Sequence, residues 1–213
     1  SLLKEYLKVE KIKFNLLSEK SFQTICKQRL MSSNQQLARI DYEQYFHANK
    51  LSNILNTFTK NIAKTDLIIV SDYGKGTVSN PRKLIQSARK TKKKILIDPK
   101  GKDFTKYKGA NLITPNKAEF ENIMGKVGSK RDLENKAKNM LEHLNLESLI
   151  VTLGSQGMYV LTKSNKKIIG DFINAYPQEV FDVSGAGDTT ISALGAALSE
   201  GNDIFSAAEF ANL

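Results

Sequence analysis

The stretch FDVSGAGDTT, near the C-terminal end of the chain, has the residue spacing that points most directly to chemistry. Three small residues, Gly185, Ala186 and Gly187, lead into Asp188, and the Ala/Leu-rich segment Ile191–Ser199 follows with helical spacing. This pattern predicts free backbone N–H groups at a helix N-terminus, where the helix dipole favours negative charge. Glycine would let the backbone approach a bulky anion. Asp188 would then stand where a base is needed for a hydroxyl that attacks a phosphoryl group. The alternative is a plain Gly-rich strand-to-helix turn with Asp188 as an N-terminal helix residue.

Further polar residues follow predicted strands. From residue 66 onward, short apolar runs alternate with helical patterns, which predicts a mostly parallel sheet covered by helices. We expect strands over Asp66–Ser71, Lys94–Asp98, Ala110–Thr114 and Ser148–Leu153, helices over Pro81–Lys90, Lys117–Met124 and Arg131–Leu144, and a hairpin of Met158–Thr162 with Lys166–Phe172. In such sheets, ligands bind at the carboxyl ends of the strands. The residues found there are Asp72, Asp98, Asn116, Gly154 and Asp188.

The first 50 residues have a different pattern. Gln23–Leu30 and Gln35–Asp41 are predicted as two strands within a strand pair at 22–42. The period of a strand puts Lys27 and Arg29 on one face, and Arg39 on one face with Asp41. The cations could hold a phosphate group, or they could belong to a solvated strand face.

Size and composition restrict the protein class. The chain has 213 residues, 40% hydrophobic and 25% charged, which suits one globular domain. No apolar run is long enough to span a membrane. Cys26 is the only cysteine, so an intrachain disulfide is excluded. We therefore expect a cytoplasmic protein without a membrane partner.

The net charge of +10 has two interpretations. A basic surface can attract nucleic acid through its phosphates. However, we find no aromatic-interleaved RNA motif and no basic heptad array, and we do not expect nucleic acid as a partner. Anionic small-molecule substrates account for part of the charge equally well.

The chain resembles the ribokinase-like (PfkB) family of sugar kinases. Five stretches carry the resemblance in the family's order: Asn34–Asp41, Ser71–Gly76, Ile97–Gly101, Thr114–Phe120 and Asp182–Thr189. The last two are typical of the whole family, and the first three point to its heptose branch. The resemblance implies an α/β fold, a ribokinase-like three-layer sandwich with a mostly parallel central sheet. It covers the chain from about residue 23, as a single partial kinase domain over 1–213 with a nucleotide-binding and catalytic core at 66–213.

The resemblance also implies roles for residues of the nucleotide site. Asp188 would take the proton of the attacking hydroxyl, and Gly185, Ala186 and Gly187 would donate N–H groups to the transferred phosphoryl group of ATP. The residues implied to bind the nucleotide are Asn116, Lys117, Ala118, Glu119, Gly154 and Gly157. Glu119 would organise Mg²⁺ through water. Asp182 would support a monovalent cation, or serve as a structural carboxylate.

Both sets of nucleotide-site residues also have structural interpretations. Asn116 and Glu119, three residues apart at a helix start, have the spacing of a capping box. Gly154 and Gly157 could simply form a tight turn.

For the sugar side, the resemblance implies ATP-dependent phosphorylation of D-glycero-β-D-manno-heptose 7-phosphate at C1. The product, the 1,7-bisphosphate, is a precursor of ADP-heptose and the lipopolysaccharide core. A phosphorylated substrate requires cations. The candidate substrate residues are Lys27, Arg29, Arg39, Lys75, Asp98 and Lys100. The alternatives are another phosphosugar or nucleoside kinase of the family, or a non-catalytic module that binds anions or nucleic acid.

Two departures from the family pattern affect the expected architecture. The chain has no match to the early Gly-Gly-Ala-Ala-Asn-type segment of the family, and it stops within a predicted helix at Leu213. We therefore expect a sandwich that is truncated at both ends. Relatives in the heptose branch carry an adenylyltransferase domain on the same chain, and a homodimer is left open.

Overall fold

The computed structural model describes residues 2–16, 23–32, 35–44, 52–176 and 185–212. The chain divides into two compact units, Ser1–Phe46 and His47–Leu213. In the first unit, helix α1 (Leu2–Val9) precedes an antiparallel hairpin of β1 (Cys26–Ser32) and β2 (Gln35–Tyr42). The first strand begins three residues later and ends two residues later than predicted, and the second extends one residue beyond the prediction. All residues of both strands are exposed, and among the described residues the sheet of this unit has two strands.

The faces of the hairpin follow the predicted period. Lys27 pairs with Asp41 and Arg29 with Arg39, so the three cations and the carboxylate share one face. Arg39 forms an ion pair of 3.0 Å with Asp41, and Lys27 forms one of 3.5 Å with Glu43. The cationic face is therefore partly neutralised within the hairpin itself.

The second unit contains a six-stranded sheet in the order β3-β4-β5-β6-β7-β8. The strands β3, β4, β5 and β6 run parallel, and β7 and β8 add an antiparallel hairpin. Their bounds are Leu67–Ser71, Lys94–Asp98, Leu112–Ile113, Ser148–Thr152, Met158–Ser164 and Lys167–Ile173. The helices are α2 (Ser52–Asn61), α3 (Pro81–Lys90), α4 (Lys117–Met124), α5 (Lys130–His143), α6 (Ala186–Ser199) and α7 (Ile204–Ala211). Short 3₁₀ turns at Ile62–Lys64, Thr105–Tyr107 and Gly154–Gln156 complete the described elements.

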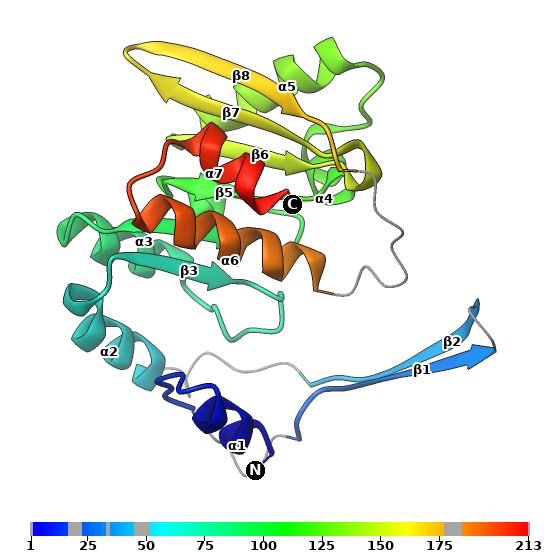
Figure 1. Cartoon of the computed structure of the whole chain (residues 1–213), viewed down its shortest axis with the longest axis vertical. Helices are drawn as coiled ribbons and strands as arrows, with labels where there is room; N and C mark the ends of the chain where they lie inside the picture. The colour runs from blue at the N-terminus through cyan, green and yellow to red at the C-terminus, as the bar shows by residue number, and fades with distance from the viewer. Residues whose placement is uncertain (1, 17–22, 33–34, 45–51, 177–184, 213) are drawn as a thin grey trace. The chain divides into compact units, whose positions relative to one another are not determined.

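The sheet separates two layers of helices, as predicted for an α/β sandwich. Alternate residues of one strand enter opposite cores: Ile95 and Ile97 of β4 lie in the core with α3 and α5, and Leu96 lies in the core with α6 and α7. Figure 1 shows α6 and α7 together on one face of the sheet. The expected mostly parallel sheet with helices on both faces is confirmed.

The position of α6 is fixed by a close approach to the sheet. A Cβ atom on Gly195 would lie 2.7 Å from Cδ1 of Ile69 and 3.3 Å from Cδ2 of Leu67, both on β3. A residue with a side chain fits there only if the side chain of Ile69 or the helix shifts. The N-terminus of α6 is thus held against the carboxyl edge of the sheet by packing further along the helix.

Candidate active site

The N-terminus of α6 has the anion-binding geometry that its sequence predicted. Gly185 precedes the helix with a φ of +81°, a left-handed conformation that favours glycine. Glycine has no side chain to cap the first N–H groups, so these remain available to a ligand. Within the described residues, a Cβ at Gly185 or at Gly187 would meet no atom within 4 Å. Packing therefore does not demand glycine at 187, whereas a bulky ligand close to the backbone would.

Asp188 lies in the first turn of α6 and lines a cavity of about 180 Å³. The cavity lies at the carboxyl edge of the sheet, and its lining comes from the ends of β3, β4, β5 and β6 and the starts of α4 and α6. The lining residues are Tyr73, Asp98, Lys100, Thr114, Asn116, Glu119, Thr152, Gly185, Gly187, Asp188 and Thr190. The structure thus brings together the predicted base, the glycines and the capping pair. Asp98 and Lys100, two of the predicted substrate residues, join them.

Three carboxylates share this small cavity, and the charge of Asp98 responds to the other two. Burial, followed by the nearby charges of Glu119 and Asp188, raises the pKa of Asp98 to about 6, although the charge of Lys100 acts in the opposite direction. A carboxyl group with a pKa near neutrality is partly protonated under physiological conditions. Asp98 can therefore donate as well as accept a hydrogen bond to a sugar hydroxyl.

The capping interpretation of the 116–119 pair is confirmed. The side chain of Asn116 accepts from the N–H of Glu119 at 2.9 Å, and Oε2 of Glu119 accepts from the N–H of Asn116 at 3.0 Å. An isolated bridge to Thr152 ties the start of α4 to the end of β6. The box does not exclude the nucleotide interpretation, because it fixes both polar side chains on the cavity wall.

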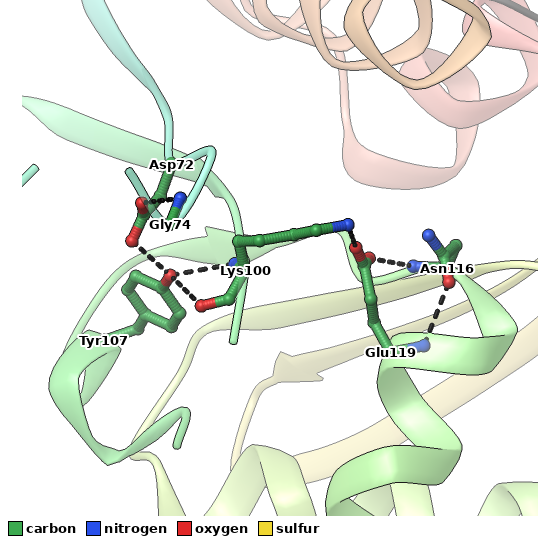
Figure 2. Close-up of polar contacts among 6 residues, drawn as sticks. All are labelled: Asp72, Gly74, Lys100, Tyr107, Asn116 and Glu119. Atoms are coloured by element: carbon green, nitrogen blue, oxygen red, sulfur yellow. Dashed lines mark hydrogen bonds and ion pairs between the residues drawn. The ribbon is translucent and has the colours of Figure 1, made fainter. Parts of the chain in front are cut away.

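Lys100 spans the cavity edge. Its Nζ lies 2.6 Å from Oε1 of Glu119, and Figure 2 shows the extended side chain that reaches from the end of β4 to the start of α4. Both carboxylate oxygens of Glu119 are therefore engaged, one by the helix cap and one by the ammonium group. From the sequence, Lys100 was predicted only as one of the cations that bind the phosphate group of the substrate.

A network beneath the cavity was missed by the sequence analysis. The carboxylate of Asp72, 4% exposed, accepts from the N–H of Gly74 at 2.8 Å, from Nζ of Lys106 at 2.7 Å and from the phenol of Tyr107 at 2.7 Å. The same phenol oxygen accepts from the N–H of Lys100 at 2.9 Å (Figure 2). Desolvation raises the pKa of Tyr107 above its ordinary value. Asp72 is thus a structural anchor for the turn after β3 and for the chain after β4.

Tyr73, which the sequence analysis did not select, contacts the predicted base. Its hydroxyl lies 3.0 Å and 3.1 Å from the two carboxylate oxygens of Asp188. Desolvation, followed by this hydrogen bond, raises the pKa of Tyr73. The available signal was its place directly after a predicted strand, next to Asp72.

The other predicted site residues lie elsewhere in the described chain. Lys117 and Ala118 are exposed on the first turn of α4. Gly154 begins the 3₁₀ turn after β6, and Gly157 ends it with a φ of +84°; a Cβ at 157 would lie 1.9 Å from the carbonyl oxygen of Ile173. Gly157 is therefore required by the sheet itself. Lys75 is half-buried in the turn after β3.

The positions of four predicted residues relative to the cavity are not tested by the structure. Lys27, Arg29 and Arg39 belong to the first unit, which is described by itself. Asp182 lies outside the described residues.

A larger cavity of about 420 Å³ lies beside the turn that follows β6. Its lining includes Lys117, Lys130, Gln156 and Phe172 and contains no carboxylate. The smaller cavity is therefore the candidate active site, because it holds a base next to exposed N–H donors.

Within the described residues, the structure contains neither a cluster of three acidic, histidine or cysteine side chains that could hold a metal alone, nor a helix that could span a membrane. Mg²⁺ commonly binds through one or two carboxylates together with substrate phosphates and water. The oxygen donors of Glu119 and Asn116 fit that mode of binding.

Comparisons with known proteins concern the family and the fold of the chain. Residues 1–213 match the sequence pattern of the family described as "pfkB family carbohydrate kinase". The bifunctional protein HldE of Shewanella piezotolerans is 42% identical over 200 residues, which are 94% of this chain and 41% of that protein. The HldE protein of Pseudomonas aeruginosa is 43% identical over 190 residues, 89% of this chain and 39% of that protein. The chain thus spans about two fifths of the length of these curated relatives.

Solved structures support the fold. The crystal structure of Sa239 has a TM-score of 0.81 at 20% identity and covers 99% of this chain and 69% of that chain. Phosphofructokinase-2 from Escherichia coli, in complex with substrates and products, has a TM-score of 0.75 at 16% identity, again covering 99% and 69%. At these identities the likeness concerns the fold alone.

Proposed function

Because the chain belongs to the pfkB family of carbohydrate kinases, we propose that its small cavity transfers the γ-phosphoryl group of ATP to a sugar hydroxyl. The observation that carries the proposal is Asp188 in the first turn of α6, next to a glycine-framed helix N-terminus with exposed N–H groups. A base and an oxyanion hole are the two groups that this chemistry requires.

The bonds made and broken follow from these positions. The acceptor oxygen forms a bond to the γ-phosphorus as the bond from that phosphorus to the β,γ-bridging oxygen breaks, and ADP leaves. Asp188 accepts the proton of the attacking hydroxyl. The N–H groups of residues 185–187 stabilise negative charge on the transferred group, in the manner of an oxyanion hole. Tyr73 orients the carboxylate of Asp188, and Asp98 positions the sugar through its hydroxyl groups.

The residues that would hold Mg²⁺ are Glu119 and, through water, Asn116. When bound, the metal neutralises charge on the β- and γ-phosphates. For the nucleotide itself, residues 116–119 and the turn from Gly154 to Gly157 are the proposed wall. Asp182 stays a proposal for a monovalent cation.

For the acceptor, we propose the C1 hydroxyl of D-glycero-β-D-manno-heptose 7-phosphate. The support is the similarity of residues 34–41, 71–76 and 97–101 to the heptose branch, together with about 40% identity to the HldE proteins. The net charge of +10 favours an anionic substrate over a neutral one.

Phosphorus NMR of the protein with Mg-ATP and the heptose 7-phosphate tests the proposal. We expect an anomeric phosphate signal that grows with time, and a loss of rate of about 10²- to 10⁴-fold with Asp188→Asn, because general-base catalysis contributes that factor. Asp66→Asn is the matched control, since it makes the same chemical change at an exposed position before β3.

The controls make the outcomes distinct. ATP binding should survive Asp188→Asn, because only the base is removed. Transfer to a different phosphosugar, but not to the heptose, would overturn the acceptor and keep the kinase. An Asp188→Asn variant as active as wild type would overturn the role of the base.

A further inference from the structure

The cavity is lined by more acidic than basic side chains, although ATP, its proposed substrate, is itself an anion. Its lining contains the carboxylates of Asp98, Glu119 and Asp188 and, among the described lining residues, one cationic side chain, that of Lys100. Negatively charged carboxylates repel a polyphosphate at close range. A cation fixed at this point would have a large effect on the reaction.

Lys100 lies in a loop, but contacts with other parts of the chain fix its backbone and its methylene stem. Its N–H donates to the phenol oxygen of Tyr107 at 2.9 Å, and that phenol is bonded to the buried carboxylate of Asp72. The methylene stem of Lys100 packs beside Gly74, where a Cβ would lie 3.4 Å from Cγ of the lysine. These contacts, at the backbone N–H and at the methylene stem, set the direction of the side chain, and Figure 2 shows it extended toward Glu119.

The ammonium group reaches the start of α4, which forms part of the proposed wall for the nucleotide. It lies 2.6 Å from Glu119, in the first turn of α4, and its charge acts on Asp98, which in turn interacts with Asp188. Its partner Glu119 has a side chain that is 12% exposed, whereas that of the lysine is 53% exposed. The lysine head can thus leave the carboxylate by a side-chain rotation, while Glu119 stays fixed in its capping box.

We propose, on the basis of the function proposed above, that Lys100 is a catalytic residue that binds the transferred phosphoryl group. In the structure its ammonium group is held by Glu119. With nucleotide bound, it exchanges this carboxylate for an oxygen of the γ-phosphoryl group. There it neutralises the charge that develops as the bond to the acceptor oxygen forms and the bond to ADP breaks. This role differs from the role predicted from the sequence, in which Lys100 holds the phosphate at the other end of the sugar.

The two roles differ in kinetics. A lysine that holds the phosphate on C7 contributes mainly to the KM of the sugar, and it distinguishes the heptose 7-phosphate from the heptose without its phosphate. A lysine on the transferred group contributes to kcat for both acceptors alike. Lys100→Met removes the charge at nearly constant shape, and Lys100→Arg keeps the charge. Lys102→Met is the matched control, because Lys102 is exposed two residues further along the same loop.

We expect Lys100→Met to lower kcat by about 10²- to 10³-fold, the range for loss of one oxyanion donor, with the KM of the phosphosugar changed by less than about threefold. Lys100→Arg should recover part of kcat, and Lys102→Met should leave it unchanged. A tenfold or greater rise in the KM of the phosphosugar at unchanged kcat would overturn the proposal and restore the sugar-phosphate role. A loss no larger than that of Lys102→Met would also overturn it.

A binding measurement separates this proposal from the proposed function. Calorimetry with Mg-ADP and aluminium fluoride, a mimic of the transferred phosphoryl group, should show about 10²-fold weaker binding for Lys100→Met, with binding of Mg-ADP alone unchanged. If the wild-type protein transfers no phosphate, the proposed function fails, and this measurement still decides the role of Lys100. Equal binding of the mimic by wild type and Lys100→Met would refute it.

Discussion

The phenol of Tyr107 supports the site from beneath, and its removal has a cost that can be worked out from the contacts. Tyr107 is fully buried. Its hydroxyl donates to the carboxylate of Asp72 at 2.7 Å and accepts from the N–H of Lys100 at 2.9 Å. The variant Tyr107→Phe removes one oxygen atom and leaves the ring in place, so it isolates these two hydrogen bonds from packing.

The two lost bonds contribute separately to the expected effect. A hydrogen bond to a charged group is worth about 1.5–3 kcal/mol, and a buried N–H without a partner costs about 1–3 kcal/mol. Asp72 keeps Gly74 and Lys106 as donors, which offsets part of the first loss. We therefore expect a destabilisation of about 3 kcal/mol. For a protein of this size that lowers Tm by roughly 6–12 °C, since each kcal/mol shifts Tm by about 2–4 °C.

Urea denaturation followed by circular dichroism measures this loss, and Tyr159→Phe provides the control. Tyr159 is also buried, but its ring packs against Phe172, with 4.6 Å between the ring centroids, and it lies outside the Asp72 network. Its variant should therefore change the free energy of unfolding by less than about 1 kcal/mol. If Tyr107→Phe and Tyr159→Phe lose the same stability, the network beneath the cavity is not the anchor described above.

Two further predictions concern other positions of the second unit. The pKa of Asp98 is raised to about 6 in the folded chain from an ordinary 3.8, so ionisation above pH 6 opposes folding, and this cost disappears as the pH falls to about 4. Asp98→Asn should thus have a higher urea midpoint than wild type at pH 8, with an advantage that shrinks through pH 6 toward pH 4; an advantage that grew on acidification would contradict the sign. Gly157→Ala should destabilise the chain by more than about 3 kcal/mol, because a Cβ meets the carbonyl of Ile173, whereas Gly154→Ala, at a positive φ in open space, should cost about 1 kcal/mol. Thermal unfolding of both variants tests the difference, and similar losses would show that the backbone conformation, and not the clash, dominates.

The sequence predicted best those elements that are defined by local signals. The bounds of α3, β4 and α4 agree with the prediction, because Pro81 stands at the first position of α3 and Asn116 caps α4. Helix α2 was not predicted, since its segment SNILNTFTKN is rich in Asn and Thr, which are poor helix formers. Tertiary packing, and not local helix propensity, therefore determines that this segment is helical.

The candidate site was predicted in part for a similar reason. Residues at the ends of adjacent parallel strands meet by geometry, so the meeting of Asp98 and Asn116 at one cavity follows from the neighbouring positions of β4 and β5. Asp188 joins them from the first turn of α6, which packs against β3 and β4. The network of Asp72 with Tyr107 joins residues 35 positions apart, through a 3₁₀ turn that has no periodic signal. Such a pairing is visible only in three dimensions.

The closest contact between helix α6 and the sheet lies far from the N-terminus of the helix, where the candidate active site is. Gly195, the point of closest approach to β3, is nine residues from Ala186, a distance of roughly 14 Å along the helix axis. A tilt of the helix by about 5° about Gly195 would move the N-terminal N–H groups by about 1 Å, and a displacement of that size can reduce a rate by about 10²-fold. We therefore expect a larger side chain at position 195 to lower the rate of the reaction as well as the stability of the fold, because it would press against Ile69.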